Sequence, residues 1–133
     1  MDPLVDTSVL VDYFRGSVNA ETEMLDWLLD QGTAPSITPV IVQEVLQGYQ
    51  AERDADAARK SLAAFDELSP PGYDVHRRAA RLFREGRRSG LTSSTVDALI
   101  VAIAIEHDLA LLTRDTVQRR LAVFAGVPVM EAQ

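Results

Sequence analysis

Short apolar runs alternate with longer segments of helical spacing along most of the chain. Four runs have the length of short buried strands: residues 4–6, 34–38, 109–113 and 127–130. Seven segments carry helical periodicity or helix-boundary residues: 7–15, 20–30, 38–49, 51–68, 75–89, 95–106 and 117–124. Buried strands that alternate with helices form parallel sheets covered on both faces. We therefore expect an α/β fold, a three-layer α/β/α sandwich around a short central parallel sheet.

Capping residues mark several helix boundaries. Thr7 or Ser8 is expected to cap the first helix, and Thr38 before Pro39 pairs a capping residue with a first-turn proline. Segment 95–106 is apolar nearly all round, so we place this helix at the centre of the domain.

Composition indicates an ordinary globular protein. The 133 residues, 47% hydrophobic and 25% charged, contain no linker or repeat, so we expect a single domain spanning residues 1–133. The absence of cysteine excludes disulfides and thiolate metal sites. No secretory signal is visible, and no apolar run is long enough to span a bilayer, so we expect a cytoplasmic protein without membrane attachment.

The formal net charge of −7 argues against a nucleic-acid partner, but two features weaken this argument. Acidic residues around a metal ion raise the negative count, and the ion offsets part of it. Lys60 is the only lysine, so the other cationic side chains are arginines, which favour bidentate phosphate contacts. Net charge therefore does not decide the question.

Four acidic residues stand where a ligand-binding edge is expected. Asp6 and Asp115 each follow a predicted strand, and ligands bind at the carboxyl edge of open parallel sheets. Asp97 lies in the first turn of the central helix, and Glu44 interrupts an apolar helical segment. We expect these four acids, from four separate segments, to meet at one edge of the sheet.

Clustered carboxylates favour a particular chemistry. They repel one another unless a cation neutralises them. Oxygen-only ligands select hard ions such as Mg²⁺ or Mn²⁺, and water activated at such an ion can attack a phosphodiester in line. The four acids therefore predict a metal-dependent phosphodiesterase.

Each acid also has a purely structural interpretation. Ser94 and Asp97 form a capping arrangement, Glu44 fits the solvent face of its helix, and Asp6 and Asp115 fit turns or helix caps. Taken together, two strand-end aspartates and an acid within an apolar segment favour a site over coincidence.

Four sequence blocks resemble the PIN-domain proteins, specifically the VapC-type toxins. The blocks occur in the family's order: 6–16 (DTSVLVDYFRG), 38–45 (TPVIVQEV), 90–100 (GLTSSTVDALI) and 111–115 (LLTRD). The resemblance spans nearly the whole chain. One departure follows Asp115, where many relatives carry an aromatic residue and this chain has TVQRRL at 116–121.

This resemblance implies a function and partners. The metal-binding acids of the family correspond to Asp6, Glu44, Asp97 and Asp115, and the implied activity is Mg²⁺- or Mn²⁺-dependent endoribonuclease cleavage. Members commonly dimerise and are neutralised by a small antitoxin protein. Ser8 and Thr113 resemble hydroxyl positions that support the family's site, although a helix cap and an ordinary strand residue explain them equally well.

Arginines recur at helical spacing in segment 75–89, at positions 77, 81, 84 and 88. Arg77, Arg81, Arg84 and Arg88 form either a solvated face or a contact for the RNA backbone. Arg114 is a further RNA-contact candidate because it adjoins Asp115. Apolar residues of the first two helices fit the core, a dimer interface or an antitoxin interface: Tyr13, Phe14, Trp27, Leu28 and Leu29.

Other functions fit less well. A haloacid-dehalogenase-like phosphohydrolase needs a second acid two residues after its first aspartate, and this chain has Ser8 there. A response-regulator receiver needs a late lysine, which Lys60 does not provide. A catalytically silent PIN-like binding module keeps the fold without the reaction, and the complete set of four acids argues against it.

Overall fold

A parallel sheet of four short strands forms the centre of the computed structural model, which describes residues 2–131. The strands are β1 (Pro3–Val5), β2 (Ser36–Ile37), β3 (Asp66–Glu67) and β4 (Ala110–Leu112), in the order β3-β2-β1-β4. Leu4 pairs with Ser36 on one side and Leu111 on the other. The expected short parallel sheet is confirmed.

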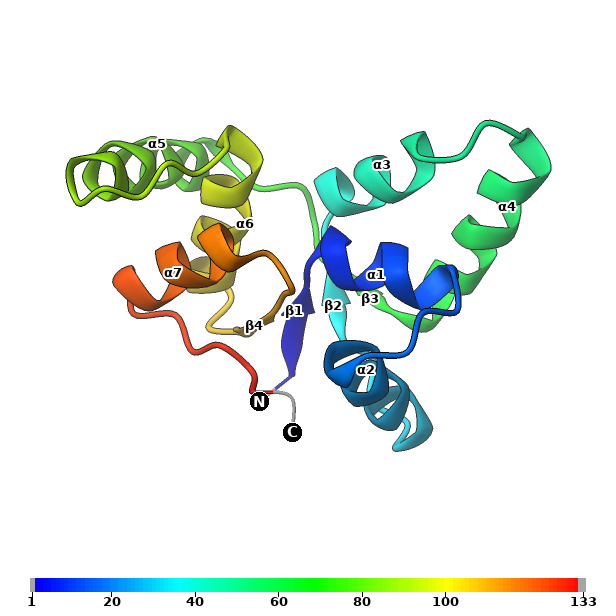
Figure 1. The fold of residues 1–133 in the computed structure, drawn as a ribbon. Helices are drawn as coiled ribbons and strands as arrows, with labels where there is room; N and C mark the ends of the chain where they lie inside the picture. Colours follow the sequence, from blue (N-terminus) through cyan, green and yellow to red (C-terminus); the bar gives the residue numbers. More distant parts are fainter. Residues whose placement is uncertain (1, 132–133) are drawn as a thin grey trace.

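Helices cover the sheet on both sides (Figure 1). One group comprises α1 (Thr7–Phe14), α2 (Ala20–Asp30), α3 (Pro39–Gln47) and α4 (Glu52–Ser61). The other comprises α5 (Tyr73–Arg88), α6 (Thr95–Glu106) and α7 (Thr116–Phe124). The three-layer α/β/α expectation is therefore correct, as parallel strands joined by right-handed crossovers require.

Two element predictions are wrong. The α-helix expected over 51–68 ends at Ser61. One 3₁₀ turn (Leu62–Ala64) follows it, and then strand β3. Main-chain bonds decide this, because the Asp66 amide donates to the Pro35 carbonyl at 2.9 Å. The strand expected over 127–130 is reduced to a single parallel bridge, Leu111 to Val129.

The core lies between the sheet and the two helical layers. Leu4, Val5, Leu111 and Leu112 are fully buried in the strands. Helix α6 is buried over most of its length, as its uniformly apolar sequence predicted. Within residues 2–131, no helix is long and apolar enough to cross a membrane.

The strand order creates a topological switch point at the carboxyl ends of β1 and β4. The chain leaves β1 into α1 on one side of the sheet and leaves the neighbouring β4 into α7 on the other (Figure 1). Ligands of open parallel sheets bind where the chain diverges in this way. Asp6 follows β1 directly and Asp115 follows β4 by three residues, so both lie at this position.

Candidate active site

Asp6 is the buried centre of the site, with only 6% of its surface exposed. It is itself the N-cap of α1, in place of the expected Thr7 or Ser8, because its Oδ2 accepts from the Ser8 amide at 2.9 Å. The Thr113 hydroxyl donates to the same oxygen at 3.4 Å, and the Gln118 side-chain amide donates to Oδ1 at 3.1 Å. Three donors therefore fix the orientation of this carboxylate.

Asp115 caps α7 on the opposite side of this switch point. Its Oδ1 accepts from the Gln118 main-chain amide at 2.9 Å, and its own amide donates to Thr113 Oγ1 at 3.0 Å. The Ser8 and Thr113 hydroxyl oxygens lie 3.4 Å apart, and Ser8 Oγ accepts from the Arg114 amide at 3.0 Å. The two hydroxyls thus connect the loop after β1 with the loop after β4.

Asp97 lies in the first turn of α6 and forms a capping box with Ser94. The Ser94 amide donates to Asp97 Oδ2 at 3.1 Å, and the Asp97 amide donates to Ser94 Oγ at 3.0 Å. Burial raises the pKa of Asp97, and the negative charges of Asp115 and Asp6 raise it further, against the opposing bonds to Ser94. Asp97 therefore lies within electrostatic reach of the other two aspartates.

Glu44 lies on α3 and contacts the turn that follows Asp6. It is half-buried, and its Oε1 accepts from the Thr7 hydroxyl at 2.6 Å. Because Thr7 follows Asp6 in the chain, this bond holds Glu44 against the turn that carries the central aspartate.

The donor chemistry fits a hard divalent cation, but the carboxylates are not gathered into a finished cluster. Among residues 2–131, no three acidic or histidine side chains stand close enough to form a metal site as they are placed. Each of the four acids accepts a hydrogen bond from a neighbouring group instead. The available ligand atoms are all oxygens, and the negative charges that help to raise the pKa of Asp97 are of the kind that a divalent cation offsets.

Gln118 is the residue of the site that the sequence interpretation missed. Its side chain is fully buried, and it contacts Asp6 across 112 positions of sequence. A signal was available, since helical spacing places Gln118 on the same inward face of α7 as the buried Leu121 and Ala122. A polar residue on a buried face requires a partner, and Asp6 supplies it.

Arg114 adjoins the site, but its side chain is engaged elsewhere. The guanidinium pairs with Asp12 of α1 and lies 3.6 Å from Glu21 of α2. Arg119 lies 3.8 Å from the same glutamate and donates to the Thr113 carbonyl at 3.1 Å. This arrangement ties the loop after β4 to α1 and α2, so Arg114 is a weaker RNA-contact candidate than its position in the sequence implied.

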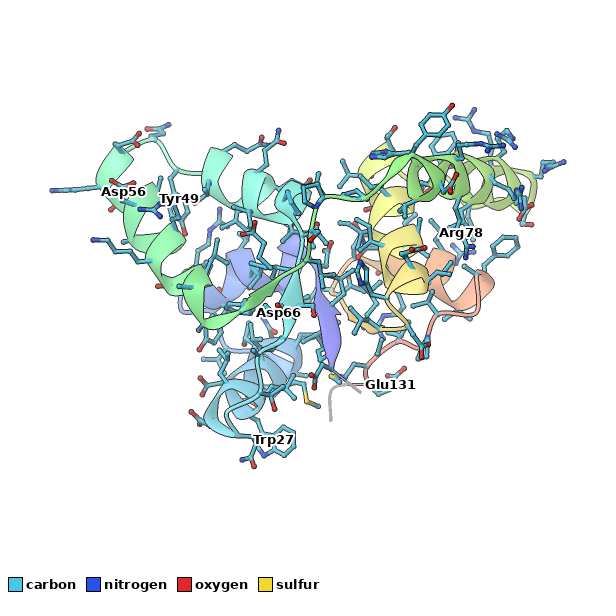
Figure 2. All side chains as sticks on the ribbon, turned by 180° about the vertical axis from the view of Figure 1, so that it is seen from behind. Trp27, Tyr49, Asp56, Asp66, Arg78 and Glu131 are labelled. Atoms are coloured by element: carbon cyan, nitrogen blue, oxygen red, sulfur yellow. The ribbon has the colours of Figure 1, made fainter. Side chains whose placement is uncertain are left out.

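Helix α5 presents an exposed row of arginines. All its arginines are exposed: Arg77, Arg78, Arg81, Arg84, Arg87 and Arg88. Figure 2 shows nitrogen-tipped side chains gathered along this helix, including the labelled Arg78. Within residues 2–131, none of these six arginines forms an ion pair. A hollow on the same helix is lined by Arg77, Arg78, Arg81 and Arg84, together with Asp74 and Ala80.

Comparisons with known proteins identify the family. The PIN domain family matches residues 4–123. The ribonuclease VapC11 of Mycobacterium tuberculosis is 30% identical over 115 residues, which cover 84% of this chain and 85% of that protein.

Solved structures are similar over nearly the full length. A toxin–antitoxin complex from Klebsiella pneumoniae is 26% identical, with a TM-score of 0.73 and coverage of 99% of this chain and 98% of that chain. VapBC2 from Rickettsia felis, solved bound to a DNA fragment from the promoter, has a TM-score of 0.79 at 16% identity and covers 98% of both chains, which is a likeness of fold. The chain therefore belongs to the PIN domain family and, within it, to the VapC ribonucleases.

Proposed function

We propose that this protein is a Mg²⁺- or Mn²⁺-dependent endoribonuclease and the toxin of a toxin–antitoxin pair. The observation that carries the proposal is the buried Asp6 at the divergence of β1 and β4, with Asp97 and Asp115 within electrostatic reach. The ribonuclease name of the Mycobacterium tuberculosis relative supports RNA as the substrate.

The chain supplies ligands and their orientation. Asp6, Asp97, Glu44 and Asp115 would hold the cation, which supplies positive charge that activates water for in-line attack and stabilises the charge of the transition state. Ser8 and Thr113 fix the loops that carry two of these acids.

The arginine row of α5 is the surface best suited to the RNA backbone. Helix α5 packs against α6, which carries Asp97, so the row belongs to the same helical layer as one acid of the site. Phosphate binding favours repeated, unpaired cations, and arginine offers two donors to each phosphate. We assign Arg77, Arg81, Arg84 and Arg88 to this contact.

A protein antitoxin and a second copy of the chain are the proposed partners. The solved neighbour from Klebsiella pneumoniae is a toxin–antitoxin complex, which supports the first. Trp27 is 57% exposed on α2, so this part of the first two helices offers an apolar contact, whereas Leu28 is buried in the core. Light scattering of the purified chain measures whether it is a dimer.

A cleavage assay tests the proposed function. The purified chain is incubated with total tRNA and rRNA in Mg²⁺, in Mn²⁺ and in excess EDTA, and the RNA ends are sequenced. We expect cleavage at defined positions with either ion and none in EDTA. A silent binding module predicts intact RNA under all three conditions, and equal cleavage in EDTA would overturn the metal-dependent mechanism.

A further inference from the structure

We propose that Gln118 is a positioning residue that orients Asp6, and with it Asp115, for the divalent cation. This inference rests on the proposed function. The Gln118 side-chain amide donates to Asp6 Oδ1 at 3.1 Å, and its main-chain amide donates to Asp115 Oδ1 at 2.9 Å. One residue thus contacts two of the four acids, which follow the neighbouring strands β1 and β4.

Packing alone does not account for a glutamine at this position. Gln118 is fully buried, and its neighbours on the inward face of α7, Leu121 and Ala122, are apolar. Among residues 2–131, its Oε1 has no hydrogen-bond partner. A buried amide with an unpaired acceptor is unfavourable, and an apolar side chain of the same length would avoid the loss. The bond to Asp6 is therefore the feature that distinguishes glutamine here.

The neutral amide suits a residue that supports a cation ligand. A lysine or arginine in its place would also hold Asp6, but its positive charge would oppose a divalent ion nearby. Gln118 occupies only one acceptor position of Oδ1, while the Ser8 amide and the Thr113 hydroxyl engage Oδ2. Each carboxylate oxygen has two lone pairs, so Oδ2 is fully engaged and Oδ1 retains one acceptor position for the ion.

Substitution of Gln118→Met tests the proposal, because methionine keeps the length and removes the donor. Gln47→Met, at an exposed position of α3, is the matched control. Mn²⁺ is titrated into each protein by calorimetry, and cleavage is measured against Mn²⁺ concentration. We expect Gln118→Met to fold, to bind Mn²⁺ about tenfold more weakly, and to regain cleavage as Mn²⁺ is raised. The control should match wild type throughout.

Unchanged Mn²⁺ affinity in a folded Gln118→Met protein overturns this role and leaves the proposed function standing. Failure of the wild type to bind either Mn²⁺ or Mg²⁺ overturns both.

NMR of the wild type gives an answer even if the variant does not fold. We expect the Gln118 side-chain amide protons to exchange with solvent far more slowly than those of Gln47, with and without Mg²⁺. Exchange as fast as that of Gln47, or protection lost on adding Mg²⁺, contradicts the role.

Discussion

Two regions of the molecule stabilise charge in opposite ways. One is the buried corner formed by Asp6, Ser8, Thr113 and Gln118, and the other is the exposed face of α5 that carries the arginines. Asp6 is 6% exposed and accepts three hydrogen bonds, whereas the arginines of α5 are exposed and form no ion pair within residues 2–131. A buried carboxylate requires fixed hydrogen-bond donors, so the side chains of this corner adopt a single arrangement. Exposed arginines keep their rotamer freedom, so their face can adapt to a varied partner.

The two regions also differ in how the chain builds them. The corner joins residues more than a hundred positions apart, since Asp6 and Gln118 are separated by 112. The arginine face comes from one continuous helix, Tyr73–Arg88. We therefore expect a single substitution to disable the corner, while the arginine face should weaken in proportion to the number of charges changed.

The largest effect is expected from Asp6→Asn. Loss of one negative ligand at the centre of the site should lower RNA cleavage by more than about a hundredfold, because even residues that only support metal ligands account for 10- to 100-fold. The fold should persist, since an asparagine oxygen can still cap α1 and the Gln118 amide can turn to accept from the new amide. Cleavage rate and circular dichroism measure the two outcomes.

Asp30→Asn is the matched control for this substitution. Asp30 is exposed at the end of α2, so this change removes the same charge at a residue outside the proposed site. Cleavage by the control should match wild type. Wild-type cleavage by Asp6→Asn would place the reaction elsewhere in the molecule.

The difference between the regions explains what the sequence could predict. Asp6 and Asp115 were found because strand-end acids are marked by local apolar runs, and the row on α5 was found because helical spacing is local. The Gln118–Asp6 bond joins segments that only the sheet brings together, so no local pattern contains it. Strand β3 was missed for a related reason, since both its side chains are exposed and only main-chain bonds define it.

A smaller, graded effect is expected from charge reversal on α5. The double substitution Arg77→Glu and Arg81→Glu should weaken RNA binding by about tenfold at low salt, because each lost phosphate contact removes counterion release. The slope of log affinity against log salt should fall by about 1.4, or ~0.7 for each contact with single-stranded RNA. Filter binding with the Asp6→Asn protein as background measures affinity without cleavage.

Arg53→Glu with Arg59→Glu is the control for this pair. Both arginines are exposed on α4, in the other helical layer, so the change in net charge is identical. This control should keep most of the affinity and salt dependence. An equal loss of RNA affinity from both pairs of substitutions would mean that binding depends only on net charge, and the α5 face would have no special role.

The smallest effect is expected in stability, from Asp97→Asn. Burial and the charges of Asp115 and Asp6 raise the folded-state pKa of Asp97 above its unfolded value. The stability that its protonated form contributes is fully present below the unfolded pKa, near 3.9, and is lost as pH rises through the folded pKa. Asparagine stays neutral and can still accept the Ser94 amide. Without metal, the Tm of this variant should therefore increase relative to that of wild type as pH rises, by less than about 4 °C at neutral pH.

Excess Mg²⁺ should reverse this order, which makes the stability measurement a test of the site as well. The cation stabilises whichever folded protein binds it, and wild type retains the ligand that Asp97→Asn has lost. Thermal melts from about pH 4 to about pH 8, in EDTA and in Mg²⁺, measure both trends against Asp30→Asn. A variant that melts above wild type under both conditions would show that Asp97 destabilises the fold and does not bind a cation. The order of the melting temperatures should reverse only if the negative charges that destabilise Asp97 without metal are also the charges that bind the ion.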